Sequence, residues 1–311
     1  MHSRNTFILI IIRKIKEKLF VMNKSFKFID LFAGIGGFHL ACHNLGGECV
    51  FASELDQNAR KTYTANYKSI SPNLFDKDGN PTKNFAGDIT NVDPKDIPDF
   101  DVLCGGFPCQ PFSQAGLKKG FADTRGTLFF NVANIIKEKN PKVVLLENVR
   151  GLLTHDNGNT FEVIKNAMDE LGYSFHYKIL KASDYGVPQN RPRLYMVGIR
   201  KDLEDKFKFP EPIKLEKKMT DIFDGKKCDK EIGYTLRVGG RGSGVGDRRN
   251  WDCYIVNGKE YRIGIKEGKR MQGFPDDFVF PVSETQAMKE LGNSVAIPVV
   301  QAVVKEFLYI L

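Results

Sequence analysis

Hydrophobic residues in the first two thirds of this chain form short continuous runs that alternate with stretches of helical spacing. Continuous runs of this length are typical of strands buried on both faces. They occupy Phe26–Phe32, Glu48–Glu54, Asp101–Cys104 and Lys142–Glu147. Helical spacing follows at Gln57–Tyr67, Thr127–Lys139 and Phe161–Leu171. Strands that alternate with helices predict an α/β fold with a mixed, mostly parallel sheet.

The pattern changes near residue 200. Two further runs, His176–Ser183 and Leu194–Arg200, indicate the arms of a β pair, and beyond them lysine and proline become frequent and periodicity is weak. A strand is expected at Cys253–Val256, a compact turn at Arg270–Phe278 and a helix at Gln286–Leu291. A last amphipathic helix, Val299–Tyr309, is expected to pack on the first domain. We therefore predict a first domain over residues 22–199, a smaller one over 200–282, and a returning segment over 283–311.

Composition places the 311-residue chain among soluble globular proteins, with 41% hydrophobic and 27% charged residues. Residues 1–21 contribute +4 to the net charge of +8, so a polyanionic partner would have to be held by a local basic patch. The six apolar residues at 7–12 cannot span a bilayer, and we expect a poorly packed extension, with Met22 as an alternative start. The six cysteines form no paired framework and no metal-ligand cluster, which favours a reduced, cytoplasmic protein without a metal.

A glycine-rich turn, Ala33–Gly37, separates the first strand from a predicted helix. Such turns let the backbone approach a ligand that faces the helix N-terminus, although GxGG is only part of the dinucleotide fingerprint and short glycine turns are common. Glu54 ends the second strand 20 positions after Gly34, where related folds hold ribose hydroxyls. Asp88 lies near the end of a third short element. A solvated acid at a strand end is the alternative for Glu54.

Two groups could carry acid–base or nucleophilic chemistry. Cys109 follows a proline at the start of a polar loop that contains Lys118, Lys119 and Arg125, which suits either a nucleophile facing a large anion or an inert cysteine. Glu147 ends a buried strand, where an ionised carboxylate needs a partner. It could cap the next helix or act as an acid with a raised pKa.

Two arginine-containing segments could bind anions. Arg191 and Arg193 flank Pro192 and could present parallel donors to a carbonyl or phosphate, or form a surface ion pair. Residues 236–250 combine five glycines with four arginines, Arg237, Arg241, Arg248 and Arg249. Glycines between arginines would let a backbone lie close to nucleic acid while guanidinium groups reach phosphates or guanine edges. A flexible solvated loop has equal weight at this point.

Five motifs in order resemble the bacterial cytosine-5 DNA methyltransferases, particularly the short restriction-modification enzymes. They are DLFAGIGG at 30–37, GFPCQPFS at 106–113, ENVRG at 147–151, QNRPR at 189–193 and GNSV at 292–295. The resemblance implies a Rossmann-like domain that binds S-adenosylmethionine, with a smaller, variable target-recognition domain. It covers the chain from about Phe26 to the C-terminus.

The resemblance also implies residue roles. Cys109 would attack carbon 6 of a flipped-out cytosine, Glu147 would pair with ring nitrogen N3, and Arg193, supported by Arg191, would hold the O2 side. The loop 110–125 would cover the base. Lys118, Lys119, Arg125 and the four arginines of 236–250 would contact DNA. The implied cofactor contacts are Phe32, Gly34, Gly36, Glu54, Asp88, Ile89, Leu128, Asn293 and Ser294.

Some residues depart from the family pattern. Leu55 stands where the family often has tryptophan, and Lys266-Glu267 replaces Arg-Glu, but no chemical group is lost and activity is expected. The implied partners are double-stranded DNA and, functionally, a cognate restriction endonuclease, for a monomer that needs no membrane. Three alternatives are a tRNA cytosine-5 methyltransferase, a nucleotide-dependent oxidoreductase with a reactive cysteine, and a catalytically silent DNA-binding regulator.

Overall fold

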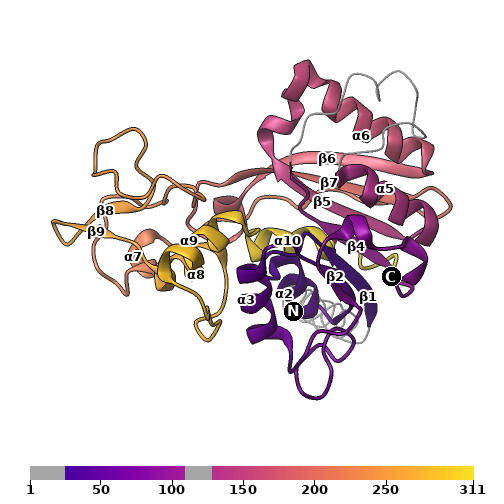
Figure 1. Ribbon diagram of the computed structural model, residues 1–311. Coiled ribbons are helices and arrows are strands. Elements are labelled where there is room, and N and C mark those ends of the chain that lie inside the picture. Colours follow the sequence, from indigo (N-terminus) through magenta and orange to yellow (C-terminus); the bar gives the residue numbers. More distant parts are fainter. Residues whose placement is uncertain (1–24, 109–127) are drawn as a thin grey trace, which may run out of the picture.

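A seven-stranded sheet forms the centre of the larger lobe in the computed structural model, which describes residues 25–108 and 128–311 (Figure 1). The strand order is β3-β2-β1-β4-β5-β7-β6. The first five strands along the chain pair in parallel, whereas β7 and β6 are antiparallel to their neighbours. The strands are β1 (Phe26–Leu31), β2 (Gly47–Ser53), β3 (Phe85–Ala86), β4 (Val102–Gly105), β5 (Val143–Val149), β6 (Tyr173–Lys181) and β7 (Pro192–Arg200). The predicted α/β class and mostly parallel sheet are confirmed.

The strand order itself places a binding site. The chain enters at β1, moves outward to β2 and β3, and then crosses to β4 on the other side of β1. In open parallel sheets, a crevice forms outside the carboxyl ends of the strands where the order reverses in this way. The site is therefore expected at the ends of β1 and β4.

Helices cover both faces of the sheet because successive strand residues point to opposite sides. Phe28 of β1 belongs to the core under α2 (Gly37–His43), α3 (Gln57–Tyr67) and α10 (Ile297–Lys305). Its neighbour Ile29 belongs to the core under α5 (Leu128–Lys139) and α6 (Asn159–Glu170). Short 3₁₀ helices occupy Ile89–Asn91, Pro94–Asp96, Arg150–Leu153, His155–Gly158 and Ala182–Tyr185.

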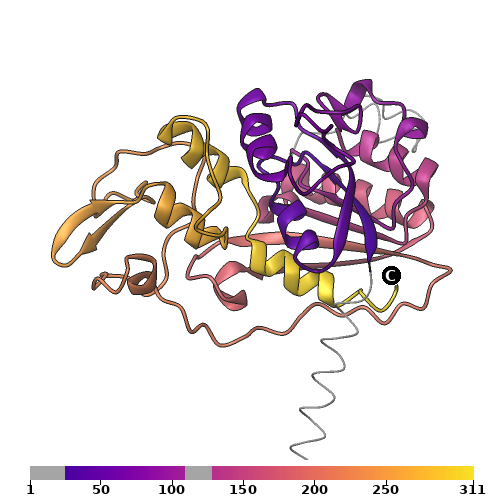
Figure 2. The same ribbon diagram turned by 90° about the horizontal axis from the view of Figure 1, so that it is seen from below.

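The second lobe contains little regular structure. It consists of α7 (Met219–Ile222), the hairpin of β8 (Cys253–Val256) and β9 (Lys259–Arg262), α8 (Ile265–Gln272) and α9 (Glu284–Asn293). The chain between β7 and α7 runs back along the first lobe before it enters the second (Figure 2). The predicted strand at Cys253–Val256 is confirmed.

The prediction of a turn at Arg270–Phe278 is wrong for Arg270 to Gln272, because α8 continues through Gln272. This helix is mostly polar, and Gly268 lowers its intrinsic helix propensity. It forms because Gly268 packs closely on α9, where an added Cβ would lie 2.9 Å from the Leu291 side chain. Glu267 accepts a hydrogen bond from the Gly264 N–H at 2.9 Å and caps the first turn.

The C-terminal helix lies on the first lobe. α10 follows directly from α9 and packs against α2 on the first lobe (Figure 1). Val300, Val303 and Val304 of α10 are buried in the same core as Phe38 of α2. Within the described ranges 25–108 and 128–311, no helix is long and apolar enough to cross a membrane.

Candidate active site and ligand pocket

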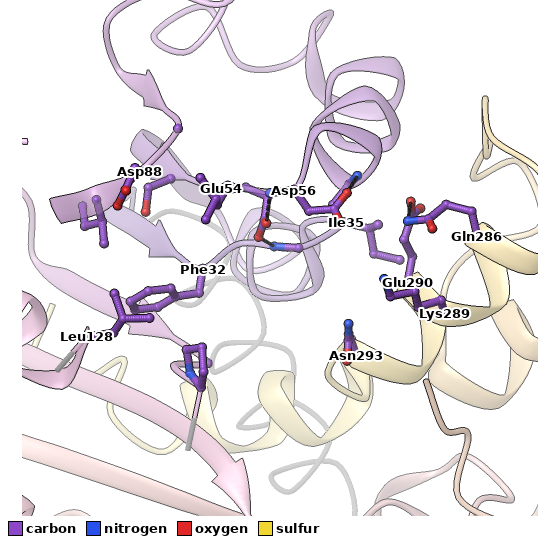
Figure 3. A pocket seen from close by; sticks show the side chains of 18 residues that line it. Phe32, Ile35, Glu54, Asp56, Asp88, Leu128, Gln286, Lys289, Glu290 and Asn293 are labelled. Carbon is purple, nitrogen blue, oxygen red and sulfur yellow. Dashed lines mark hydrogen bonds between the residues drawn. The ribbon is translucent and has the colours of Figure 1, made fainter. Parts of the chain in front are cut away.

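A cavity of about 370 Å³ opens where the strand order predicts it, at the carboxyl ends of β1 and β4, and it extends to the end of β2 and to α9 (Figure 3). Phe32, Leu128 and Asp88 lie at one end, and four residues of α9 lie at the other (Figure 3). Seven of the nine predicted cofactor residues line this cavity: Phe32, Gly34, Glu54, Asp88, Ile89, Leu128 and Asn293.

The glycine turn forms one wall with an unusual backbone. Phe32, Gly34 and Gly36 all have positive φ angles, of 55°, 56° and 83°. A positive φ is uncommon for a residue with a bulky side chain, and such strained positions cluster at ligand sites. The Ala33 N–H donates to the Ser53 carbonyl at 2.9 Å, which ties the turn to the end of β2.

Gly36 supports the turn from behind without lining the cavity. The Tyr67 hydroxyl donates to the Gly36 carbonyl at 2.6 Å. A Cβ added at Gly36 would lie 2.3 Å from the Tyr67 ring, so only glycine permits this approach. The Tyr67 ring in turn stacks on His39, with 4.1 Å between ring centroids.

His39 belongs to a buried polar cluster beneath the turn. Its ring nitrogens hydrogen-bond to the Tyr63 hydroxyl at 2.5 Å and to the Ser71 hydroxyl at 3.1 Å. Its backbone N–H donates to the Asp30 carboxylate at 3.2 Å, near the start of α2. Burial lowers the pKa of His39 to about 3, so the ring is neutral at physiological pH. Burial also raises the pKa of Asp30 well above its usual value.

Glu54 and Asp56 line the cavity after β2. The Glu54 carboxylate accepts hydrogen bonds from the backbone N–H groups of Gly34 and Asp56, both at 2.7 Å. Burial raises the pKa of Glu54, and these two hydrogen bonds oppose the shift. The bonds fix the carboxylate at the cavity wall and leave it lone pairs for further donors.

Asp88 lies at the opposite end of the cavity from α9. Its carboxylate accepts the Thr90 N–H at 2.9 Å, and the hydrogen bonds from Thr90 lower the pKa of Asp88. The same contact caps the 3₁₀ helix Ile89–Asn91 and holds Ile89 at the cavity. Asp88 is therefore an ionised, oriented carboxylate at neutral pH.

The α9 wall contains four residues on one helix face: Gln286, Lys289, Glu290 and Asn293. Of these, only Asn293 was predicted. Glu290 accepts a hydrogen bond from the Thr62 hydroxyl at 2.8 Å, which joins α3 to α9, and another from Gln286 within α9 at 3.0 Å. The spacing i, i+3, i+4, i+7 is the sequence signal that could have found the whole set, because it defines one side of a helix. Predicted Ser294 lies behind this wall and does not line the cavity.

Charge in the cavity is mostly negative. Four carboxylates, of Glu54, Asp56, Asp88 and Glu290, line it together with the single cation of Lys289. A concave site of one charge sign concentrates ligands of the opposite sign. The cavity therefore suits a ligand with positive charge, hydroxyl donors and an apolar ring to place against Phe32 and Leu128.

Glu147 and Arg193 meet beside this cavity. Glu147 lies in β5 and Arg193 in the neighbouring strand β7, and Arg193 Nε is 3.2 Å from Glu147 Oε1. The direction of the N–H does not give hydrogen-bond geometry, so this buried oxygen has no hydrogen-bond donor among the described residues. Burial raises the pKa of Glu147, while Arg193 and then Arg191 oppose the shift. A desolvated carboxylate with an unused oxygen is a typical acid–base group.

The segment that leads to Cys109 passes between Glu147 and the cavity. Gly106 and Pro108 line the cavity, and a Cβ added at Gly106 would lie 3.8 Å from Glu147 Oε2. The Asn148 side chain donates to the Phe107 carbonyl at 2.8 Å, which ties this segment to the end of β5. Cys109, Lys118, Lys119 and Arg125 lie outside the described residues.

Arg191 is placed differently from Arg193. Its side chain is buried, with 3% exposure, and its guanidinium donates to three backbone carbonyls. These belong to Leu236 at 3.1 Å, Gly292 at 3.0 Å and Ser294 at 2.6 Å. Burial lowers the pKa of Arg191 to about 9, so the group remains charged at neutral pH.

The four arginines of residues 236–250 that are predicted to contact DNA also divide into two kinds. Arg237 and Arg248 are exposed, and Arg249 is exposed but pairs with Asp247 at 2.8 Å. Arg241 instead pairs with the fully buried Asp252 at 3.1 Å and donates to the Ile263 carbonyl at 2.8 Å. Its guanidinium is thus used to hold the second lobe together. In the described part of the chain, no cluster of three or more His, Cys, Asp or Glu residues could hold a metal ion.

Comparisons with known proteins identify the family of the chain. Residues 26–240 and 240–308 match the model of the C-5 cytosine-specific DNA methylase family. The chain is 43% identical to the Type II methyltransferase M.SsoII of Shigella sonnei over 92% of this chain and 81% of the relative. It is 40% identical to the Type II methyltransferase M.HhaI of Haemophilus parahaemolyticus over 88% and 92%. The crystal structure of DNMT2 from Spodoptera frugiperda shares the fold, with a TM-score of 0.69, 21% identity and coverage of 90% and 98%.

Proposed function

This chain belongs to the C-5 cytosine-specific DNA methylase family, and we propose that it transfers a methyl group from S-adenosylmethionine to carbon 5 of a cytosine in double-stranded DNA. The observation that carries the proposal is the position of Glu147 and Arg193, 3.2 Å apart, next to the Gly106–Pro108 segment that leads to Cys109. The segment that precedes Cys109 in the sequence thereby lies between the Glu147 carboxylate and the ligand cavity.

The cavity fits S-adenosylmethionine, which supplies an electrophilic methyl group when it is bound. Glu54 would accept hydrogen bonds from the ribose hydroxyls, and Phe32, Ile89 and Leu128 would pack against the adenine. Asp88 would hold the adenine edge. The excess of carboxylates in the cavity favours a cation such as the sulfonium. Gly36 and Ser294 would act from behind the wall by shaping it.

The chemistry at the cytosine requires activation because carbon 5 is a weak nucleophile. The Cys109 thiolate would add to carbon 6, and carbon 5 would gain enamine character if ring nitrogen N3 were protonated or strongly hydrogen-bonded. Glu147 would provide that bond, since burial favours its protonated form. Arg193 would hold the O2 side. Carbon 5 would then accept the methyl group and lose its proton, and elimination of Cys109 would restore the ring.

The DNA would reach this site with the target cytosine flipped out of the duplex, at a cost of a few kcal/mol. The exposed Arg237 and Arg248 on the second lobe would contact phosphates or base edges. The 200–282 region would then act as the target-recognition domain. Because the relatives are named Type II methyltransferases, we propose that the chain protects host DNA from a cognate restriction endonuclease. We further propose that it acts as a monomer.

Bisulfite sequencing of DNA from cells that express the chain tests this proposal. We expect one cytosine within a fixed short sequence to resist conversion throughout the genome. A Cys109→Ser variant, produced at the same level, should leave that cytosine fully convertible, because a hydroxyl is a much weaker nucleophile than a thiolate. Unprotected DNA together with methylation of purified tRNA by the wild-type protein would contradict the proposal.

A further inference from the structure

Arg191 lies in a buried polar junction between the two lobes. It starts from the segment before β7, and its three acceptors come from two distant parts of the chain. Leu236 begins the arginine- and glycine-rich segment of the second lobe. Gly292 and Ser294 flank Asn293, which lines the ligand cavity. One side chain thus bonds to the backbone on both sides of a cavity residue and to the start of the proposed DNA-binding segment.

Two buried glutamines extend the junction. Gln189 accepts the Leu236 N–H at 3.0 Å and donates to the Met271 carbonyl at 2.8 Å. Gln272 donates to the carbonyls of Leu291 at 2.7 Å and Ser294 at 3.1 Å. Neither glutamine side chain is exposed. The ends of α8 and α9, the Leu236 backbone and the β7 entry are therefore held by one continuous hydrogen-bond network.

Close packing reinforces the network at Gly292. A Cβ added there would lie 2.5 Å from the backbone carbon and oxygen of Arg237. Backbone atoms at that distance cannot be accommodated by rotating a side chain. The last turn of α9 and the start of the arginine- and glycine-rich segment therefore lie directly against each other, and glycine is required for it.

We infer that Arg191 is a positioning residue that couples cofactor binding in the cavity to DNA binding on the second lobe. The inference rests on the proposed function. Displacement of Leu236 or of the α9 end away from β7 would leave a buried guanidinium without its acceptors, which is strongly unfavourable. A ligand that fixes either segment therefore favours the position of the other. Coupling of this kind is reciprocal, so each ligand should tighten the binding of the other by the same factor.

The coupling can be measured with S-adenosylhomocysteine, which binds without turnover. Its dissociation constant would be determined by calorimetry, with and without a duplex that carries the sequence protected in the bisulfite experiment. For the wild-type protein we expect DNA to tighten binding by about 5- to 150-fold, the usual range of such couplings. Arg191→Lys keeps the charge but lacks the guanidinium fork, and it should reduce this factor to about 2-fold or less.

Two further variants separate coupling from folding. Gly292→Ala leaves Arg191 intact but forces Arg237 away from α9, and it should reduce the factor in the same way. Arg200→Lys, at the last residue of β7, is the matched control, because its guanidinium also bonds to a backbone carbonyl, that of Asn140, but far from the junction. It should leave the factor unchanged.

The possible results distinguish a failure of the inference from a failure of the proposed function. Folded Arg191→Lys or Gly292→Ala protein with the wild-type factor would overturn the inference, even if its melting temperature fell. If Arg191→Lys does not fold, the factor measured for Gly292→Ala decides whether the inference holds. A wild-type protein that methylates DNA but shows no effect of DNA on cofactor affinity would overturn the inference and leave the proposed function intact. Absence of both methylation and cofactor binding would overturn both.

Discussion

In the larger lobe, the polar side chains of the proposed site are held by few bonds, whereas in the smaller lobe many charged side chains pair with one another. Glu54 accepts two backbone N–H groups and Glu147 has an oxygen without a hydrogen-bond donor among the described residues. On the smaller lobe, the single carboxylate of Asp252 forms ion pairs with both Arg241 and Arg262. Both sets of groups are ionisable, but only the first retains bonding capacity for a ligand.

The difference follows from the cores of the two lobes. A seven-stranded sheet with helices on both faces buries enough apolar surface to hold strained turns and an unsatisfied carboxylate. The smaller lobe has only a two-stranded sheet and short helices. Small cores need additional interactions, and here ion pairs supply them. Charge in a small lobe is therefore a poor guide to ligand contacts until the internal pairs have been identified.

The largest expected effect is the loss of methyl-transfer rate when Glu147 is replaced. Glu147→Gln removes the ionisable acid but retains the shape, and we expect single-turnover methyl transfer to slow by roughly 10²–10⁴-fold, the usual contribution of a positioned acid. Cofactor affinity should change little. Glu170→Gln, at an exposed position of α6, is the control and should have the wild-type rate. A loss below about tenfold would mean that Glu147 is not the acid.

The second effect concerns the glycine turn. Gly36→Ala and Gly172→Ala both place a side chain at a positive φ, of 83° and 88°, but a Cβ at position 172 meets no atom within 4 Å. Gly172→Ala should lower the free energy of unfolding by about 1–2 kcal/mol. Gly36→Ala should lower it further and weaken cofactor binding, because the new Cβ displaces Tyr67. Equal thermal shifts and equal cofactor affinities would contradict the assigned role of Tyr67.

The third effect is on pH dependence. Burial raises the pKa of Glu147, so its protonated form persists to higher pH than in a free glutamate and is lost as pH rises through the raised value. Single-turnover rates should therefore fall on the alkaline side by up to about tenfold per pH unit. This alkaline fall of the rate should be absent from the Glu147→Gln variant. A variant that keeps it would show that another group titrates there.

The smallest effect separates two arginines of the second lobe. Arg248→Met should reduce the salt dependence of DNA binding by about one unit of slope and leave stability unchanged, because Arg248 is exposed. Arg241→Met should lower the free energy of unfolding by about 1–3 kcal/mol, since it removes a partner of buried Asp252. Its salt slope should match the wild type. Salt titrations and chemical denaturation of both variants decide whether the two roles are separate.

Features formed by local sequence were predictable. The strands β1, β2, β4 and β5 follow from continuous apolar runs, because each strand of a parallel sheet is buried on both faces. The glycine turn and Glu54 follow from their position after β1 and β2. Together they were enough to identify most of the cavity wall in the larger lobe.

Features that depend on distant partners were not predictable. Arg191 and Arg193 belong to one short motif, and the motif gives no sign that they have different partners. Arg191 bonds to backbone carbonyls that lie 45 to 103 positions away, whereas Arg193 faces Glu147. Arg241 and Arg248 have the same kind of sequence surroundings, and only the position of Asp252 beside Arg241 distinguishes their roles. Helix α8 is not predictable from its mostly polar sequence because much of its stability comes from packing on α9.

The α9 wall has a consequence for how the protein is made. The cavity begins at Phe32 and is closed by Asn293, which the ribosome adds 261 positions later. At about 5–20 residues per second, some 13–50 s pass between the two. During that time the nascent chain can form most of the sheet but has no complete cofactor pocket. Methylation is thereby restricted to chains whose second lobe has already been synthesised.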